Sequence, residues 1–320
     1  MALAWAAWLC ICVVWGTTYL AIRIALETVP PALMGAMRWI AAGGILAAGV
    51  WLRRQPWPPV RDWPGFALGG LLLIGLGNGG VIFAEQFVPS GLAAVIVATV
   101  PFWMVGVEAA LPSGERISRM TVLGLLVGFA GIVLLVWPEL EHGGGGAAQF
   151  AWGIVALQIA CAGWALGSTY AKRHAVQAGV AAGTALQMVF GGVLMLIVGL
   201  AAGEPSALAF SPRSAAAVAY LTLAGSVGGF LAYTYALRHL PISTVSLYAY
   251  VNPVIAVILG ALVLDEPLGA RIVMATALVL SGSAIVRMSG AAADIPRRLG
   301  TATTLRGRVA RLWRRGLPPS

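Results

Sequence analysis

Charged residues are scarce in this sequence. Asp, Glu, Lys and Arg make up only 10% of its 320 residues, whereas an ordinary soluble domain carries about 25%, and 60% of the residues are hydrophobic. A chain of this composition cannot cover its surface with polar side chains, which excludes a water-soluble globular protein. The net charge of +9 then has no soluble domain through which to bind nucleic acid. It indicates topology and attraction to anionic lipid instead.

Residues that carry catalysis or bind metals are also few. The three histidines, His142, His174 and His239, fall in loops or at the ends of apolar runs, and the three cysteines lie inside apolar runs. No HExxH, GxSxG or Walker motif is present. We therefore expect neither an enzyme nor a metal site, and an intramembrane enzyme is kept only as an alternative class.

Long apolar runs with few or no charged residues dominate the chain instead; Arg38, Glu108 and Arg271 lie within the second, fourth and tenth of them. A helix rises about 1.5 Å per residue, so crossing about 30 Å of hydrocarbon takes about 20 residues. Ten runs have this length, at residues 3–22, 32–52, 64–84, 91–111, 119–137, 150–171, 180–202, 214–236, 242–264 and 269–287. Barrel strands would alternate polar and apolar residues over about 10 residues, so the runs predict helices. The fold class is all-α, a polytopic membrane protein with ten transmembrane helices.

The distribution of basic residues predicts the orientation. With ten crossings both termini lie on one side, which then holds sixteen of the 20 Lys and Arg residues. Arg23, Arg213 and Arg271 fall on the other side, and Arg38 lies within a run. This asymmetry predicts cytoplasmic termini in a bacterial inner membrane. The basic tail has two open interpretations, an amphipathic helix along the inner leaflet and a disordered segment.

The two halves of the sequence match each other at a shift of about 151 residues. Four separated matches support this duplication: residues 16–19 fall on 167–170, Pro89 and Pro101 on Pro241 and Pro253, Glu115 on Glu266, and Gly131 on Gly282. Each half has five crossings, so the second half is inverted relative to the first, an architecture that secondary transporters use for alternating access. The expected organisation is a first repeat at 1–138, an external Gly-rich linker at 139–149, a second repeat at 150–288 and a cytoplasmic tail at 289–320.

The same residues carry a resemblance to a known family. The features are Trp15-Gly16, Arg23, Arg38, Pro101 and Gly114-Glu115-Arg116 in the first half, and Pro253, Asp265-Glu266-Pro267 and Gly282 in the second. With them the chain resembles the drug/metabolite transporter (DMT) superfamily, in its ten-helix EamA-like family, over residues 5–288. Within this family the chain looks similar to bacterial amino-acid exporters of the YddG type. The resemblance implies transport of small metabolites, often export of amino acids, without a covalent cofactor.

Polar and aromatic residues at interior depths are the candidates for substrate binding. They are Trp15, Asn78, Trp103, Trp164, Tyr248 and Asn252. Amides and a phenol can bind both ends of a zwitterion, and its ammonium can sit over an indole face for roughly 1 to 2 kcal/mol. Phosphate esters would favour a pair of fixed interior cations, which is absent from these runs. The alternatives are packing or lipid contact for the tryptophans and interhelical hydrogen bonding for Asn78, Tyr248 and Asn252.

Two prolines and one arginine complete the predicted site. Pro101 and Pro253 lie near mid-membrane, where each should interrupt its helix and free a carbonyl four residues earlier. The alternative is a simple packing kink. Arg38 is the intramembrane charge, expected in an ion pair or polar network inside the bundle. Snorkelling to the outer interface and contact with a substrate carboxylate stay open as alternatives.

Taken together, these features predict a secondary transporter that exports aromatic and neutral amino acids by alternating access through a central cavity. Its expected partners are an amino-acid-like small molecule and the lipid bilayer, with no nucleic acid, and we expect a monomer. Alternatives are another metabolite or drug class, or a channel.

Overall fold

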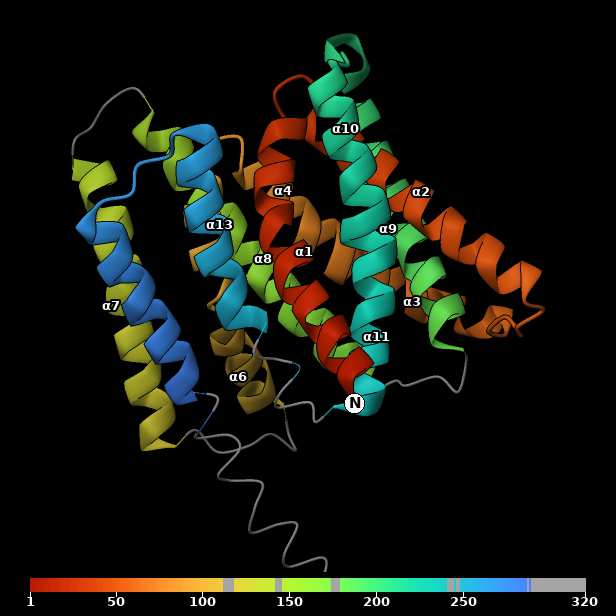
Figure 1. The fold of residues 1–320 in the computed structure, drawn as a ribbon, viewed down its shortest axis with the longest axis horizontal. Coiled ribbons are helices and arrows are strands. Elements are labelled where there is room, and N and C mark those ends of the chain that lie inside the picture. The colour runs from red at the N-terminus through yellow and green to blue at the C-terminus, as the bar shows by residue number, and fades with distance from the viewer. Residues whose placement is uncertain are drawn as a thin grey trace, which may run out of the picture.

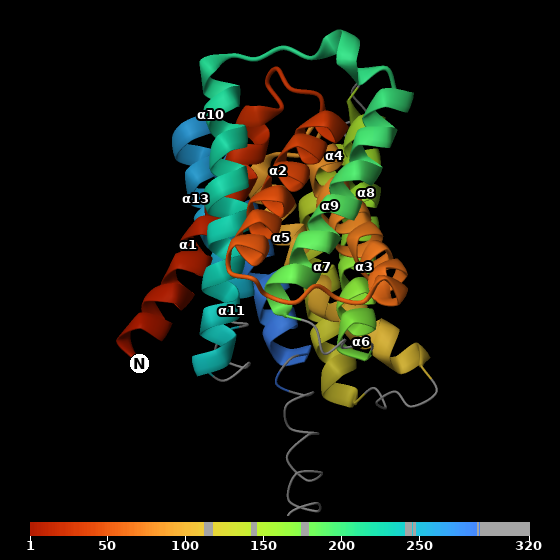
Figure 2. The ribbon, with the colours of Figure 1, turned by 90° about the vertical axis from the view of Figure 1, so that its right-hand side faces the viewer.

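The molecule is a bundle of helices that run between two faces (Figures 1 and 2). The computed structural model describes residues 1–111, 118–141, 146–173, 179–240, 245, 248–286 and 288. Every regular element within these residues is helical, which confirms the predicted all-α class. The predicted tail at 289–320, the centre of the linker at 142–145, and His174 lie outside the described residues.

The helices follow the predicted runs. In the first half they are α1 Ala2–Ala25, α2 Pro31–Leu52, η1 Val60–Asp62, α3 Trp63–Gly69, η2 Gly70–Asn78, α4 Gly79–Ala84, α5 Ser90–Val97, α6 Val100–Ala110 and α7 Arg119–Glu141. In the second half they are α8 Ala147–Arg173, α9 Val180–Ala201, η3 Glu204–Ala207, α10 Pro212–Tyr220, η4 Leu221–Gly228, α11 Gly229–His239, α13 Tyr248–Leu264 and the helix Ala270–Val286.

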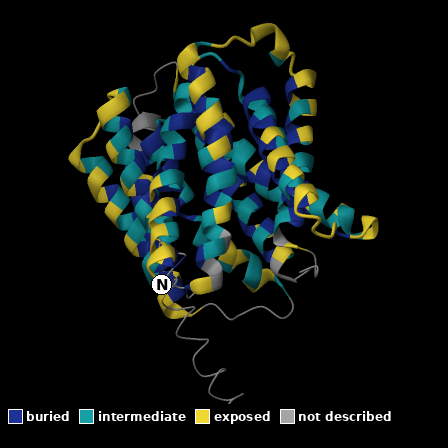
Figure 3. Ribbon diagram, turned by 45° about the vertical axis from the view of Figure 1, so that its right-hand side comes forward, coloured by how far each residue is buried: buried dark blue, intermediate teal, exposed yellow. Residues whose placement is uncertain are grey.

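These elements make ten crossings of a membrane. Eight continuous spans are long and apolar enough to cross, and α13 and Ala270–Val286 are shorter apolar helices. Large hydrophobic side chains such as Phe129, Ile197 and Leu262 are exposed, as in Figure 3, where exposed residues lie along the outside of the bundle. A lipid-facing surface explains this exposure, because apolar patches of this extent are rare on soluble monomers. We call the end where α1 begins the N-terminal face and the end where α2 begins the opposite face.

The two halves share an unusual local structure. The third span contains a π-helical segment, η2, and the eighth span contains another, η4. Their first residues, Gly70 and Leu221, are separated by the same shift of 151 that relates the two halves of the sequence. π-Helical turns are rare and frequently lie at functional sites. The duplication is therefore visible in backbone geometry as well as in residue identity.

Equivalent helices of the two halves pack against each other. α2 lies along α9, and a Cβ at Gly43 of α2 would lie 2.7 Å from Val189 Cγ2. α7 lies along Ala270–Val286, where a Cβ at Gly282 would lie 2.5 Å from the carbonyl oxygen of Gly124. Both pairs come together because glycine leaves room for backbone contact. This is the arrangement of two inverted five-helix repeats.

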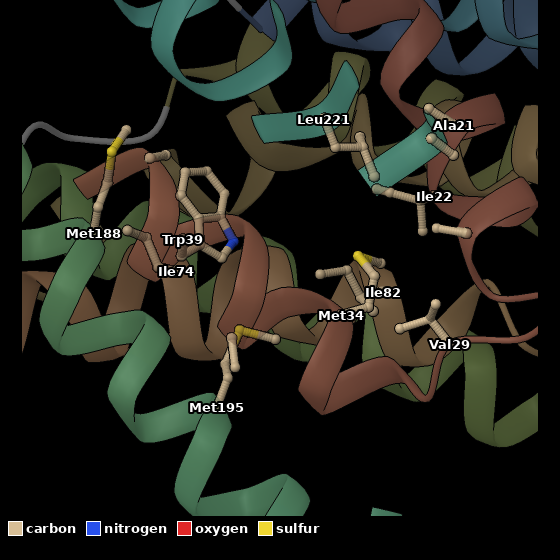
Figure 4. Packing of buried hydrophobic residues seen from close by; sticks show 14 of the residues in the cluster. Ala21, Ile22, Val29, Met34, Trp39, Ile74, Ile82, Met188, Met195 and Leu221 are labelled. Atoms are coloured by element: carbon tan, nitrogen blue, oxygen red, sulfur yellow. The ribbon is translucent and has the colours of Figure 1, made fainter. Parts of the chain in front are cut away.

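The largest buried cluster lies between the repeats. It includes Met34 and Trp39 of α2, Met188 and Met195 of α9, and Leu221 of η4, all buried. Figure 4 shows these side chains among those that α1, η2 and α4 add to the cluster. The hydrophobic core therefore joins the halves and does not belong to either one.

The two prolines behave differently. The fourth span breaks at Ala98 and Thr99, between α5 and α6, and Pro101 lies in the first turn of α6. The ninth span was expected to break at Pro253, and this is wrong, because Pro253 lies inside α13. It is the sixth residue of α13, so only the first turn of this helix has to accommodate the missing N–H.

Candidate functional site

An aromatic cluster lies where α1 of the first repeat meets α11 and α13 of the second. The Trp15 ring centroid is 5.0 Å from that of Tyr248, 5.4 Å from Tyr233 and 6.2 Å from Phe230. Tyr233 and Tyr248 also contact each other edge to face, with centroids 6.1 Å apart. Trp15, Tyr233, Phe230 and Tyr248 are all half-buried. This group is called the aromatic cluster below.

Small and amide residues bring α1 and α13 together beneath the aromatic cluster. A Cβ at Gly16 would lie 2.8 Å from Ile255 Cβ, so the absence of a side chain there allows the helices to approach. Asn252 is buried, and with its amide nitrogen facing α1 it donates to the carbonyl oxygens of Cys12 and Tyr248, each at 3.0 Å. Asn252 therefore has a structural task, joining the two repeats one residue before Pro253.

The π-helical segment η4 supplies polar partners to two of the predicted residues. Trp15 Nε1 donates to the carbonyl oxygen of Gly225 at 3.0 Å, and Arg38 Nε donates to Ser226 Oγ at 2.9 Å. Both bonds cross from the first repeat to the second. A Cβ at Gly225 would lie 3.6 Å from Arg38 Nη2, so the guanidinium and the indole flank the same short stretch of backbone.

Arg38 is held inside the bundle. Its side chain is 4% exposed, and its Cζ lies 4.4 Å from the centroid of the Trp39 ring, a cation–π contact. Nη1 is buried and has no hydrogen-bond partner among the residues that the structure describes. Arg38 thus takes part in an interior polar network and does not snorkel to the interface.

The other three predicted residues form a second group around α8. Trp103 of α6 is 38% exposed and donates from Nε1 to Gln158 Oε1 at 2.9 Å. Trp164 of α8 lies beside η2, where a Cβ at Gly77 would be 3.3 Å from its Cε3. Asn78 donates from Nδ2 to the carbonyl oxygen of Leu73 at 3.0 Å, so its amide is used within the π-helical segment. The contacts of the six candidates therefore fall into two sets, one where α1 meets α11 and α13 and one beside α8 and η2.

Glu85 is a buried residue that the sequence did not single out. It directly follows α4, one residue beyond the third span, and is 0% exposed. Its backbone carbonyl accepts a hydrogen bond from Arg23, but neither carboxylate oxygen has a partner in the described part of the chain. Burial, then Glu266, raises the pKa of Glu85 well above its usual value, while Arg23 and Arg38 act to lower it.

Glu85 was overlooked because it stands at the end of an apolar run, where a charge is usually solvated. One available signal was its setting, since the next residues toward Pro89 include Phe87 and Val88. Ser226 and Tyr233 were also missed, as single polar residues in the eighth run. A polar side chain in such a run is costly without a partner, which is the signal that could have found both.

Carboxylates of the second repeat cap helices of the first at the opposite face. Glu266 accepts hydrogen bonds from Ser90 N at 2.7 Å, Ser90 Oγ at 2.8 Å and Gly91 N at 3.0 Å, at the start of α5. Glu204 accepts from Leu33 N at 2.8 Å and from Ala32 N at 3.1 Å, at the start of α2. A carboxylate satisfies the free N–H groups of a helix N-terminus and interacts favourably with its dipole. These bonds hold the repeats together at this face.

A hollow of about 490 Å³ lies near the same face. Its lining includes Phe87, Leu92, Phe150, Val257, Glu266 and Arg271. Residues of both repeats line this hollow, and Glu266, whose carboxylate caps α5, is one of them. None of the six predicted binding residues lines it.

Ten membrane-crossing helices in two inverted halves, with polar contacts between the halves, define a polytopic membrane protein built from inverted repeats. The chain belongs to the EamA-like transporter family, whose model matches residues 2–137 and 151–288. The resemblance to the drug/metabolite transporters is thereby confirmed.

Curated relatives agree with this family. The chain is 40% identical over 249 residues to the uncharacterized inner membrane transporter YedA of Escherichia coli (strain K12), covering 78% of each protein. It is 29% identical to the protein PagO of Salmonella typhimurium, covering 76% of this chain and 79% of PagO. Identity to the uncharacterized transporter YvbV of Bacillus subtilis is 27%, over 86% of this chain and 88% of YvbV. The chain is a multi-pass protein of the bacterial inner membrane type.

A solved crystal structure has the same fold. It is 23% identical to this chain, with a TM-score of 0.60, and the match covers 92% of this chain and 98% of the other. At this identity the likeness establishes the fold alone.

Proposed function

We propose that this protein is a secondary transporter that exports aromatic and neutral amino acids by alternating access. The observation that carries the proposal is that Trp15 of the aromatic cluster and Arg38 donate to adjacent residues of η4, Gly225 and Ser226, where the two repeats meet. A site between inverted repeats is where rocking of one repeat against the other exposes a ligand to each side in turn.

The chemistry of this junction suits a zwitterion. Arg38 Nη1 is a buried donor without a protein partner in the described residues, and a guanidinium binds a carboxylate well. The ring of Trp15, with Tyr233 and Tyr248 beside it, can accept an ammonium group or stack on an aromatic side chain. One arginine together with neutral aromatic groups favours an amino acid over a phosphate ester.

Alternating access requires bonds that can open at one face. The caps that Glu266 and Glu204 place on α5 and α2 are such bonds, because they are short, few and formed between the repeats. The break before Pro101 and the segments η2 and η4 give each repeat a point where a helix can bend. In this proposal the opposite face is closed and opens when the carboxylate caps part.

The orientation is part of the proposal. The excess of Lys and Arg on the side of the termini favours cytoplasmic termini, which makes the opposite face external. Cysteines introduced at Gly144 and Gly307, both outside the described residues, should react with an impermeant reagent from opposite sides. Reaction of both from the same side would contradict the ten-helix orientation.

The test of the function is a substrate panel in proteoliposomes. We expect saturable flux of aromatic and medium-sized neutral amino acids in the wild type, with broad selectivity. Tyr248→Ala should reduce this flux without loss of folded protein. Trp5→Ala is the control, because Trp5 is an exposed aromatic residue of α1 outside the aromatic cluster. A phosphorylated sugar that showed saturable flux while all amino acids did not would overturn the assignment.

A further inference from the structure

The side chain of Glu85 is buried without a hydrogen-bonding partner among the described residues. It is 0% exposed, and neither Oε1 nor Oε2 has a partner in the part of the chain that the structure describes. An ionised carboxylate in such a place loses its hydration and receives no donor in return, whereas the protonated acid carries no charge. The arrangement fits the protonated form of Glu85.

Charged groups from several elements surround this carboxyl. Arg23 of α1, Arg38 of α2 and Glu266 of the loop after α13 all interact with it electrostatically. Tyr19 of α1 also lies within electrostatic reach. The two arginines favour the ionised form, and burial and Glu266 favour the protonated form.

The remaining elements that pack here are apolar or use their polar groups elsewhere. α8 presents Gly153 to Ala84 and Val88, on either side of Glu85, and adds Leu157 to the same cluster. Ser90 at the start of α5 is occupied by Glu266. The balance between the two forms of Glu85 is therefore set first by burial and then by the charged groups of α1, α2 and the loop after α13.

We propose that Glu85 is a proton-binding site whose protonation is coupled to transport. The site takes up one proton on a carboxylate oxygen and releases it again, with no other bond made or broken. The coupling rests on the transport activity proposed above, whereas the binding of the proton does not.

A physical connection links this site to the substrate junction. Tyr19 lies one helical turn from Trp15 on α1, and it is within electrostatic reach of both Glu85 and Tyr248. Arg38 provides the second link, because it interacts with Glu85 and donates to Ser226 of η4. When Glu85 ionises, it attracts the guanidinium that the second repeat otherwise holds. Loss of the proton thus weakens a contact between the repeats.

The proton site can be tested without any substrate. In wild-type protein reconstituted in lipid, infrared spectra should show the carbonyl stretch of a protonated carboxyl at neutral pH, and this band should disappear on titration to alkaline pH. Glu85→Gln should remove the band, and Glu27→Gln, which changes a partly exposed carboxylate paired with Arg213, should leave it. An unchanged band in Glu85→Gln overturns the proton site. Glu85→Asp, which keeps a carboxyl, should retain a shifted band and serves if Glu85→Gln does not fold.

Coupling is tested by flux. A pH gradient across proteoliposomes should change the rate of net amino-acid flux at least several-fold in the wild type. Glu85→Gln should still exchange labelled for unlabelled substrate but lose the response to the gradient. The coupling is overturned if the pH gradient does not change flux in the wild type, or if it changes flux equally in the wild type and in Glu85→Gln. If no amino acid is transported at all, the proposed function fails, and the infrared titration still decides the proton site.

Discussion

Arg38 of the first repeat donates from Nε to Ser226 Oγ of the second repeat at 2.9 Å, deep in the bundle. The bond joins α2 to the π-helical segment η4, and the same segment accepts a hydrogen bond from Trp15. A buried charge on one repeat is therefore held by a serine hydroxyl on the π-helical segment of the other. Movement of the repeats has to change this contact.

Replacing Arg38 tests whether its shape matters as well as its charge. Arg38→Lys keeps the charge but loses the planar set of donors. A lysine therefore cannot both donate to Ser226 Oγ and place a second donor where Nη1 lies. We expect amino-acid flux to fall about tenfold or more, since hydrogen bonds to charged groups contribute about 1.5–3 kcal/mol. Flux in proteoliposomes at matched protein content is the measurement, with exposed Arg53→Lys as the control. Wild-type flux and expression in Arg38→Ala would remove Arg38 from the site.

Trp15 and Tyr248 should contribute to affinity more than to folding. Trp15→Phe retains an aromatic ring but loses the Nε1 bond to Gly225 and part of the contact with Tyr248. We expect apparent substrate affinity to weaken by about three- to tenfold, in keeping with about 0.5–1.5 kcal/mol for an aromatic pair. Concentration dependence of flux measures this change. Trp5→Phe should leave affinity unaltered, and an equal loss in both variants would mean that the aromatic cluster is not the binding site.

Much of the fold could be predicted because the bilayer imposes it. Run length fixed the number of crossings, and the 151-residue shift indicated two inverted halves, which the paired segments η2 and η4 now show in the backbone. The π-helical geometry itself was not predictable, since no residue pattern in 70–78 or 221–228 demands it. Pro253 was misjudged because its depth was counted from the start of the apolar run at residue 242, whereas α13 begins at Tyr248.

The candidate site was predicted in part. Depth in the membrane selected Trp15, Tyr248 and Arg38, which the structure brings to the junction of the repeats. Depth alone could not tell which helices face each other, so the sequence did not show which of the six candidates contact one another. Glu85 was missed because a linear sequence does not show that helices from both repeats bury the end of α4.

Close packing of α7 against Ala270–Val286 predicts a strong dependence on residue size. Gly282→Ala would place a methyl group 2.5 Å from the Gly124 carbonyl oxygen, so we expect a loss of about 1–3 kcal/mol in unfolding free energy. Gly106→Ala in α6 is the matched control, because nothing lies within 4 Å of its Cβ, and a helical alanine should be neutral or stabilising. Thermal unfolding in detergent compares the two. Equal midpoints would argue against this helix pair.

The stability of the protein should depend on pH through Glu85. Because burial raises the pKa of Glu85 in the folded protein, the folded state binds this proton more tightly than the unfolded state. The resulting stabilisation is complete below the ordinary pKa of a glutamate and is lost as the pH rises through the raised value. The wild-type unfolding midpoint should therefore fall with rising pH by more than that of Glu85→Gln. If the unfolding midpoints of the two proteins changed with pH in parallel, the raised pKa of Glu85 would be contradicted.

The central claim, a carrier whose amino-acid site lies between the repeats, is tested most directly by counterflow. Proteoliposomes loaded with an unlabelled aromatic amino acid are diluted into a trace of the labelled compound, with wild-type and Tyr248→Ala protein compared at equal content. The proposed mechanism predicts transient, saturable accumulation of label in the wild type and a marked reduction in Tyr248→Ala. Equilibration of the label without accumulation would indicate a channel. If a phosphorylated sugar showed counterflow and amino acids did not, the proposed site would be contradicted.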